Sequence, residues 1–377
     1  MPMIRAATPA DIASLVAIEN RSFDSDRLSR RNFKYLLTKA KSVILVDDAG
    51  GDIRGYALLL FHAGTSLVRL YSLAVDPDSR RRGIGTALLE ACEEAARERD
   101  GVTLRLEVRQ DNHPAIALFK KRGYKQFGVL EDYYEDHMEA VRLEKSLIPH
   151  LRPELARVPY YRQTLDFTCG PAALMMAMKT LDPELTLSRT LELRIWREST
   201  TIFMTSGHGG CGPYGLALAA YRRGFDVEVY VNDEGALFLD SVRSQEKKEV
   251  IRLVQDDMLE EIQKLPIRLT YGSLGVSDLQ EKVEEGGIPI VLISSYRIYQ
   301  EKFPHWVVVT GFDERYVYVH DPFVDQENGK TETDCVNMPI LKKSFERMAR
   351  YGKAGQKAVL ILRERERQSA APGIAVA

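Results

Sequence analysis

The sequence has few of the features that mark membrane, disulfide-rich or nucleic-acid-binding proteins. Its longest apolar runs, such as residues 288–293, have the length of strands, whereas a membrane-spanning helix needs about 20 apolar residues. Four cysteines at irregular spacing in 377 residues do not form a disulfide framework and indicate reduced thiols. Lys and Arg number 52 against 54 Asp and Glu, so no excess of one sign would attract nucleic acid or an acidic membrane.

The N-terminal segment, Met1 to Arg5, lacks the basic segment and apolar stretch of a signal peptide. With 45% hydrophobic and 28% charged residues, the composition is typical of a soluble globular protein. We therefore expect a cytoplasmic protein. Its length suggests two domains, and the sequence shows no internal repeat.

The chain divides into two halves with different patterns. We predict a first domain over residues 1–148, a linker over 149–157, a second domain over 158–364 and a flexible tail over 365–377. The first domain alternates predicted helices (11–23, 86–99 and one beginning at Pro114) with predicted strands (42–47, 55–62, 67–75 and 103–108). In the second, helices at 170–180, 212–223, 245–264 and 277–285 precede strands at 288–294, 305–312, 315–320 and 357–363. That arrangement predicts an α+β domain.

A basic, glycine-containing turn stands in the stretch LAVDPDSRRRGIGTALLEA, residues 73–91. A predicted strand ends at Val75, an Asp-Pro pair interrupts it, and Arg80 to Gly85 lead into a predicted helix. Gly83 and Gly85 let backbone N–H groups approach an anion, and the helix N-terminus adds about half a positive charge. The turn suits a pyrophosphate, and by itself it also suits a solvated basic helix cap.

The order of elements around this turn resembles that of the GNAT acetyltransferases over nearly all of residues 3–145. Arg80-x-x-Gly83-x-Gly85 is similar to their acetyl-CoA pyrophosphate motif. The resemblance is strongest to bacterial enzymes that acetylate the N-terminal alanine of a ribosomal protein, in the segments LEVRQDNHPAIALFKKRGY (106–124) and YYED (133–136). It implies an α/β GNAT fold, a mixed central sheet with helices on both faces, and acetyl-CoA as cofactor. The residues it implies for the cofactor are Leu73, Ala74 and Val75 for the pantetheine arm, Arg80, Arg81, Arg82, Gly83, Ile84, Gly85 and Thr86 for the pyrophosphate, and Asn112.

Glu107 matches the general base of that family. A carboxylate at the open end of the central strand would take a proton from an amine nucleophile, through water. The other interpretation is a strand-edge carboxylate that pairs with Arg105 or Arg109.

Phe119 departs from the family pattern. It stands where those enzymes have a tyrosine that protonates the departing thiolate, and phenylalanine has no proton to donate. Tyr124, Tyr133 or Tyr134 would replace it, the thiolate would leave unassisted, or the domain would bind acetyl-CoA without efficient turnover. We expect an active transferase.

The second half contains the tripeptide Cys-Gly-Pro twice, at residues 169–171 and 211–213. A cysteine nucleophile requires a stabilised thiolate, a histidine base, a group that orients the histidine, and a donor to the oxyanion. Cys169 stands where a helix begins, because Thr168 precedes it and Pro171 suits a first turn, so the helix dipole would favour its thiolate. Gln163 lies six residues upstream, and its amide would meet the substrate carbonyl beside the Cys169 N–H.

The stretch PHWVVVTGFDERYVYVHDPF, residues 304–323, predicts a hairpin. His305 opens an apolar strand, a short turn follows at 313–315, and the returning strand leads to Asp321. Because the two strands are antiparallel neighbours, His305 and Asp321 should lie at the same end of the hairpin. An aspartate there would fix the imidazole tautomer and stabilise the imidazolium.

The order Gln163, Cys169, His305 and Asp321 resembles that of papain-like peptidases. It is more similar to the peptidases that remove double-glycine leaders from bacteriocins, which also have Gln, five residues, Cys-Gly-Pro, then His before an apolar strand and an Asp-Pro. The resemblance covers about residues 157–363, with a charged helical insertion near 233–275. It implies an α+β papain-like cysteine-peptidase domain with these four catalytic residues.

Cys211 lacks this context. Thr205 stands six residues before it in place of a glutamine, and glycines flank it on both sides. His208-x-x-Cys211 has metal-like spacing, but no second pair completes four ligands, so we predict no metal site. We expect Cys211 to be a small buried residue or to line the substrate cleft, and Cys169 to be the nucleophile.

Both halves would act on amines or amides of peptides. We therefore expect a bifunctional enzyme whose substrate is a peptide or protein with a free amine, N-terminal or lysine, and no nucleic-acid or membrane partner. Two other classes fit the sequence. In the first, the second half is a thiol acyltransferase or amidase that uses the same Cys–His pair. In the second, one or both halves are non-catalytic modules that recruit a peptide to a partner enzyme.

Overall fold

The computed structural model describes residues 2–151, 153–200, 209–239 and 242–365. The chain divides into two units, Met1–Arg152 and Pro153–Ala377. The division falls inside the predicted linker 149–157, and part of that segment forms strand β8 (Glu154–Leu155), which pairs with β12 (Pro304–Phe312) of the second unit. Of the predicted tail, residues 366–377 lie outside the described part of the chain, whereas Arg365 pairs with Asp226.

The first unit is built around a seven-stranded sheet with the order β1-β2-β3-β4-β5-β7-β6. Strands β4 and β5 are parallel, and the other neighbours are antiparallel. The strands are β1 (Ile4–Ala6), β2 (Ser42–Asp48), β3 (Ile53–Phe61), β4 (Leu67–Val75), β5 (Thr103–Arg109), β6 (Lys125–Leu130) and β7 (Ala140–Ser146). The helices are α1 (Ile12–Ser22), α2 (Arg30–Thr38), α3 (Ile84–Arg97) and α4 (His113–Lys121).

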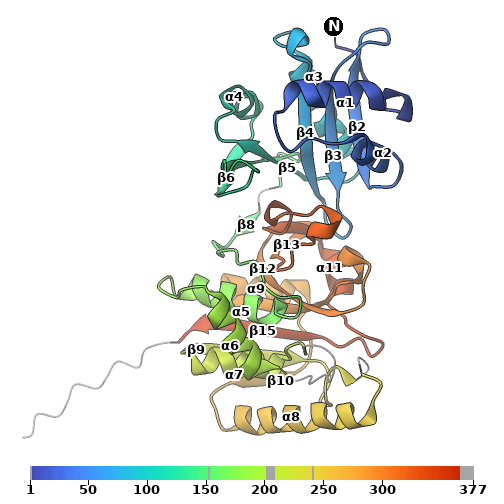
Figure 1. Cartoon of the computed structure of the whole chain (residues 1–377). Coiled ribbons are helices and arrows are strands. Elements are labelled where there is room, and N and C mark those ends of the chain that lie inside the picture. Colours follow the sequence, from blue (N-terminus) through green and yellow to red (C-terminus); the bar gives the residue numbers. More distant parts are fainter. Residues whose placement is uncertain (1, 152, 201–208, 240–241, 366–377) are drawn as a thin grey trace, which may run out of the picture. The chain divides into compact units, whose positions relative to one another are not determined.

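Helices cover both faces of this sheet (Figure 1). Successive side chains of a strand point to opposite faces, so apolar residues on both faces need helices to bury them. On β2, Ile44 and Val46 pack with residues of α1 and α2, whereas Leu45 between them packs with residues of α3. The buried Phe119 of α4 belongs to the same cluster as Leu45. The predicted mixed sheet with helices on both faces is confirmed.

The second unit contains an eight-stranded sheet with the path β10-β9-β15-β11-β12-β13-β14 and β8 beside β12. Only β9 and β10 are parallel among the described pairs. The remaining strands are β9 (Phe225–Val231), β10 (Arg268–Tyr271), β11 (Ile288–Ser294), β12 (Pro304–Phe312), β13 (Tyr316–His320), β14 (Met338–Leu341) and β15 (Ala358–Glu364). The helices are α5 (Cys169–Leu181), α6 (Arg189–Ser199), α7 (Pro213–Arg222), α8 (Gln245–Gln263), α9 (Val276–Glu284), α10 (Tyr296–Tyr299) and α11 (Lys342–Met348).

Two apolar clusters fill the two sides of this second sheet. On β12, Trp306 and Val308 pack with α5 and α7, whereas Val307 and Val309 pack with α9 and α11. The predicted α+β class is confirmed, but the expectation that all strands come late is wrong, because β9 precedes α8. Sequence reasoning missed β9, whose sequence FDVEVYV alternates charged and apolar residues. It also missed helix α6.

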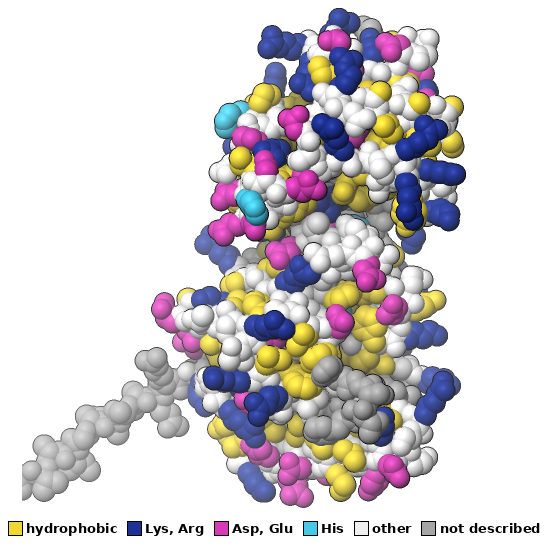
Figure 2. Space-filling view, viewed as in Figure 1, with side chains coloured by type: hydrophobic (Ala, Val, Ile, Leu, Met, Phe, Trp, Pro, Cys, Tyr) yellow, Lys and Arg dark blue, Asp and Glu magenta, His cyan; other side chains and the backbone are white. Residues whose placement is uncertain are grey.

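None of the helices in the described ranges is long and apolar enough to span a membrane. On the face shown in Figure 2, Lys and Arg side chains are interspersed with Asp and Glu. This matches the near balance of charge in the whole sequence.

Candidate active sites

In the first unit, strands β4 and β5 separate after a short paired stretch. Their pairing is described only for Leu67–Arg69 with Thr103–Arg105, while β4 stays paired to β3 as far as Val75. The edge of Leu73–Val75 that faces away from β3 therefore has no strand partner among the described residues. The amide groups of an extended ligand can form hydrogen bonds with the backbone N–H and C=O groups of this edge, as a neighbouring strand would. The pantetheine arm of coenzyme A has groups of this kind.

The predicted pyrophosphate turn lies between that edge and α3. Arg81 and Gly83 both have left-handed backbones, with φ of 63° and 79°, and Gly83 is the N-cap of α3. A methyl group added at Gly83 would meet nothing within 4 Å, so the N-terminus of α3 is open to an anion. The buried side chain of Ile84 anchors the turn, and the Arg80 Nε donates to the Val75 carbonyl at 3.2 Å. These features fit a pyrophosphate.

Asn112 is the N-cap of α4. Its side-chain oxygen accepts from the Ala115 N–H at 3.2 Å, so the carbonyl side of the amide stabilises the helix. A contact with the cofactor would use its NH₂ group.

The Glu107 carboxylate lies on β5, just beyond the stretch paired to β4. The Nε and Nη2 groups of Arg69 both lie 2.9 Å from its Oε2, and the Arg69 Nη2 also donates to the hydroxyl of Tyr133 at 2.9 Å. The side chains of Glu107 and Arg69 are 4% and 3% exposed. Sequence reasoning considered an ion pair but missed Arg69, because that cation belongs to the neighbouring strand. Arg105 contacts Glu144.

The three candidate tyrosines have different surroundings. Tyr124 is buried edge-on against Phe119, with ring centres 5.5 Å apart, and burial raises its pKa, as does Glu93 nearby. Burial and then the charge of Glu107 raise the pKa of Tyr133, which therefore keeps its proton at neutral pH. Tyr134 packs edge-on against Tyr133 at 5.0 Å. Of the three, Tyr133 shares the hydrogen-bond network of Glu107.

In the second unit, Cys169 is the first residue of α5, a helix that is buried from Cys169 to Met178. The apolar run after the Cys-Gly-Pro segment packs against β12 and α7, so the N-terminus of α5 is held at the end of the core. The positive end of the helix dipole favours an anion at the position of the Cys169 sulfur.

The hairpin of β12 and β13 brings His305 and Asp321 together. The His305 Nε2 lies 2.6 Å from Asp321 Oδ1, and both side chains are buried. The Phe323 N–H donates to the same oxygen at 2.9 Å, and the Tyr299 hydroxyl donates to Oδ2 at 2.5 Å. Because Asp321 occupies Nε2, Nδ1 is the ring nitrogen available to Cys169.

The electrostatics of this pair favour an imidazolium beside a carboxylate. Burial by itself would lower the pKa of His305, but the charge of Asp321 and its hydrogen bond to the ring, with smaller effects of Cys169, together outweigh burial and raise the pKa to about 10. Burial would raise the pKa of Asp321, but the charge and the hydrogen bond of His305, together with Lys330 and Tyr299, outweigh burial and hold that pKa below its usual value. The rings of Tyr299, Phe303 and Phe323 pack edge-on against the imidazole, with ring centres 5.9–6.5 Å apart, and shield it from water.

Gln163 is 7% exposed and lies in the segment that leads to Cys169. Its backbone N–H donates to the carbonyl of Pro322, next to Asp321, at 2.9 Å, and its side-chain NH₂ donates to the carbonyl of Leu165 at 2.9 Å. An NH₂ group has two protons, so the second can serve a substrate carbonyl. Its Oε1 has no hydrogen-bond partner in the described part of the chain.

Cys211 packs behind the first turn of α5. A methyl group added at Gly170 would lie 3.3 Å from its Cβ, and its carbonyl accepts from the Trp306 Nε1 at 3.0 Å. Burial raises the pKa of the Cys211 thiol well above its usual value, and Cys169 nearby adds to the effect. These contacts fit a small buried residue. His208, the partner in the metal-like spacing, lies outside the described residues.

Sequence reasoning missed three polar residues near this site: the half-buried Tyr299 and the buried Lys330 and Glu192. Lys330 is 5% exposed, with its Nζ 4.5 Å from the centre of the Tyr299 ring, and it contributes to the low pKa of Asp321. Tyr299 and Lys330 belong to no motif. Glu192 stands one turn before the buried Ile195 on α6, and that helical spacing was the one available signal.

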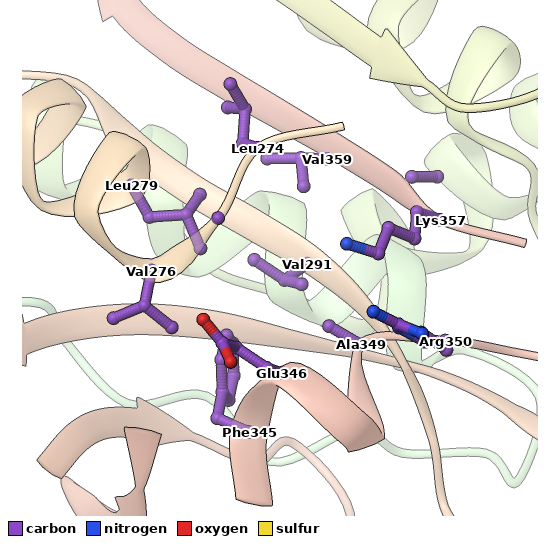
Figure 3. Close-up of a pocket in the computed structure, with 12 residues that line it drawn as sticks. Leu274, Val276, Leu279, Val291, Phe345, Glu346, Ala349, Arg350, Lys357 and Val359 are labelled. Atoms are coloured by element: carbon purple, nitrogen blue, oxygen red, sulfur yellow. The ribbon is translucent and has the colours of Figure 1, made fainter. Parts of the chain in front are cut away.

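A cavity of about 160 Å³ lies elsewhere in this unit, between α9, α11, β11 and β15. Figure 3 shows Val276, Leu279, Val291 and Phe345 around it. These residues belong to the cluster on the side of the sheet away from α5. No described residue of the Cys169 site lines this cavity.

Comparison with known proteins separates the two units. Residues 11–124 match the Acetyltransferase (GNAT) family, whose acetyl donor is acetyl-CoA. An N-alpha-acetyltransferase of Sulfurisphaera tokodaii is 33% identical over 148 residues, 36% of this chain and 88% of that protein. A ribosomal protein bS18-alanine N-acetyltransferase of Salmonella typhimurium is 41% identical over 75 residues, 19% of this chain and 51% of that protein. The crystal structure of the Escherichia coli ribosomal-protein-S18-alanine N-acetyltransferase matches at 27% identity and a TM-score of 0.36, over 39% of this chain and 94% of that one.

The second unit matches a different family. Residues 158–363, more than half of the chain, match the Peptidase_C39 like family. This range begins before Gln163 and ends beyond the His305–Asp321 hairpin. The chain therefore belongs to the Peptidase_C39 like family through residues 158–363 and to the GNAT acetyltransferases through its N-terminal unit.

Proposed function

We propose that this protein modifies peptides or proteins with two active sites: acetyl transfer to an amino group in the first unit, and thiol-dependent cleavage of a peptide bond in the second. The observation that carries the second activity is the buried His305–Asp321 pair beside Cys169 at the N-terminus of α5. The names of the relatives of the first unit support an N-terminal amine as the acetyl acceptor.

In the second unit, the Cys169 sulfur attacks the carbonyl carbon of the scissile bond. The His305 imidazolium gives its proton to the departing amine as the C–N bond breaks, and a thioester with Cys169 remains. The neutral imidazole then takes a proton from water, whose oxygen attacks the thioester and releases the acid and Cys169. The backbone N–H of Cys169 and the second amide proton of Gln163 would donate to the oxyanion. Asp321 keeps the imidazole oriented through Nε2.

In the first unit, acetyl-CoA supplies the acetyl group as a thioester. The free edge of Leu73–Val75 would bind the amide arm, and the backbone N–H groups of residues 81–86 with their arginines would hold the pyrophosphate. Glu107 takes the proton from the attacking amine, directly or through water, and Arg69 orients its carboxylate. The Tyr133 hydroxyl belongs to the same hydrogen-bond network and keeps its proton. It protonates the departing thiolate, the role of the tyrosine that stands in place of Phe119 in related enzymes.

Labelling and product analysis test the second activity. An alkylating probe should label the wild type and Cys211→Ala at neutral pH, and Cys169→Ala should abolish that labelling. A peptide library with mass-spectrometric detection then distinguishes free acids, the products of hydrolysis, from products of transfer to an amine. Loss of labelling in Cys211→Ala with retention in Cys169→Ala would reverse the assignment of the nucleophile.

Thermal unfolding with and without acetyl-CoA tests the first activity. The ligand should raise the melting temperature of the transition that belongs to the first unit, because it binds only the folded form. The absence of a shift at millimolar acetyl-CoA would remove this part of the proposal.

A further inference from the structure

Helix α6 contributes a carboxylate to the interior of the second unit. Glu192 is 0% exposed, and each of its oxygens accepts two hydrogen bonds. Oε1 accepts from the Thr164 N–H at 2.8 Å and the Thr168 hydroxyl at 2.5 Å. Oε2 accepts from the Thr164 hydroxyl at 2.6 Å and the Tyr161 hydroxyl at 3.1 Å. In the described ranges no Lys or Arg forms an ion pair with it.

Such a carboxylate is costly to bury, and neutral donors must compensate the lost hydration. All four donors come from one short segment, residues 161–168. They are the hydroxyls of Tyr161, Thr164 and Thr168 and the backbone N–H of Thr164. The carboxylate therefore gathers this segment around itself.

That segment joins two residues of the proposed active site. Gln163 lies within it, and Thr168 immediately precedes Cys169 as the N-cap of α5. The side chain of Thr168 makes no cap hydrogen bond to α5, and its hydroxyl oxygen lies 2.5 Å from Glu192 Oε1 and 2.9 Å from the carbonyl oxygen of Leu165. A usual N-cap hydroxyl stabilises its own helix, so here the hydroxyl ties the start of α5 to α6.

We propose that Glu192 is a positioning residue for the thiol chemistry: it holds the 161–168 segment so that Cys169 meets His305 and Gln163 faces the substrate carbonyl. This inference rests on the proposed function of Cys169. Glu192 acts through Thr164 and Thr168 and touches neither the substrate nor the reacting atoms. Its hydrogen bonds, and not its charge, carry the effect.

Two substitutions separate the hydrogen bonds from the charge. In Glu192→Gln, the amide oxygen can accept from the Thr164 N–H and the Thr168 hydroxyl. Its NH₂ can donate to the hydroxyls of Tyr161 and Thr164, which rotate to accept. Glu192→Ala removes all four bonds. Glu198→Ala on the same helix is the matched control, because it removes a carboxylate that pairs with Arg223 outside the segment.

The measurement is the rate of alkylation of Cys169 by iodoacetamide in the full chain from pH 5.5 to 9, well below the melting temperature of each variant. We expect Glu192→Ala to slow alkylation at pH 6 by about tenfold or more, because the 161–168 segment then no longer holds Cys169 against His305. Glu192→Gln and Glu198→Ala should stay within about threefold of the wild type and keep its pH profile.

Three outcomes are distinguishable. If Glu192→Ala lowers the melting temperature but leaves the alkylation rate and its pH profile unchanged, Glu192 is only structural and the inference is wrong. If Glu192→Gln is as slow as Glu192→Ala, the charge matters and the positioning argument is wrong. If wild-type Cys169 is alkylated at the rate of an ordinary thiol, the proposed function of Cys169 is wrong, and the inference about Glu192 is wrong with it. Should Glu192→Ala not fold, Thr168→Val, which removes one of the four bonds, provides the same comparison.

Discussion

Replacement of Asp321 by asparagine tests what keeps the His305 imidazole charged. Burial would lower the pKa of His305, and the charge of Asp321 is the main influence that raises it to about 10. At pH 8 a group with that pKa is about 99% protonated, whereas one at or below the usual 6.5 is at most about 3% protonated. Asparagine keeps the volume and an oxygen acceptor for His305 and Phe323 but removes the charge. We therefore expect the protonated fraction of His305 at pH 8 to fall about thirtyfold or more.

NMR of the full chain with labelled histidine measures this fraction, and His305→Gln assigns the resonance. In the wild type the His305 ring should keep the chemical shift of an imidazolium from pH 5.5 to 8.5, and in Asp321→Asn it should be neutral at pH 8. Glu327→Gln is the matched control, because it removes an exposed charge from the same loop. A ring that remains charged at pH 8 in Asp321→Asn would refute the reasoning.

The same substitution has a signed effect on stability. The folded protein binds the His305 proton more tightly than the unfolded chain does. The stabilisation is therefore complete below pH 6.5 and is lost as the pH rises toward 10. The free energy of unfolding of the wild type should exceed that of Asp321→Asn by more at pH 6 than at pH 9. Chemical denaturation at both pH values measures this difference, and a gap that widens with pH contradicts it.

Three further predictions concern other parts of the molecule. Gly170→Ala places a methyl group 3.2–3.3 Å from three neighbouring side chains. We expect the free energy of unfolding of the second unit, measured by denaturant titration, to fall by about 1–3 kcal/mol. An unchanged midpoint would show that the neighbouring side chains move to make room. Gly83→Ala forces a side chain into a left-handed backbone at the N-terminus of α3, so calorimetry should show weaker acetyl-CoA binding, with an equal affinity counting against the pyrophosphate site. Glu107→Gln and Tyr133→Phe should each lower kcat for acetyl transfer by about a hundredfold, measured as release of free coenzyme A, and an active Tyr133→Phe would exclude that residue as the proton donor.

Local patterns in the sequence predicted most of the secondary structure. The helices at α3, α5 and α7 and the strands at β4, β11 and β12 appear close to where apolar periodicity and Gly or Pro boundaries placed them. Helix α6 was missed, because charged residues interrupt its apolar pattern, and β9 was missed although its alternation of apolar and charged residues is typical of a strand. Those charges find partners far away in sequence, as when Glu228 of β9 meets Arg363 of β15.

The hairpin alone predicted that His305 and Asp321 lie at the same end of two antiparallel neighbours. It did not predict the shift of register between Val309 and Gly311, which changes the residues that lie opposite each other beyond it. The partner of Glu107 could not be predicted in this way. Arg69 lies on β4, and the chain reaches the parallel strand β5, which carries Glu107, only after the crossover helix α3. No periodicity within one element predicts which residues of β4 and β5 come to face each other.

The amino-acid sequence by itself determined the two families, the cysteine at the start of a helix and the hairpin that supplies its histidine and aspartate, because these depend on residues near one another along the chain. Tertiary structure decided which polar groups support them: Arg69 and Tyr133 around Glu107, Tyr299 and Lys330 around Asp321, and Glu192 beneath the Cys169 segment. The physical reason is that a buried polar side chain takes its partners from whichever elements pack against it. Packing joins positions that no spacing in the sequence relates.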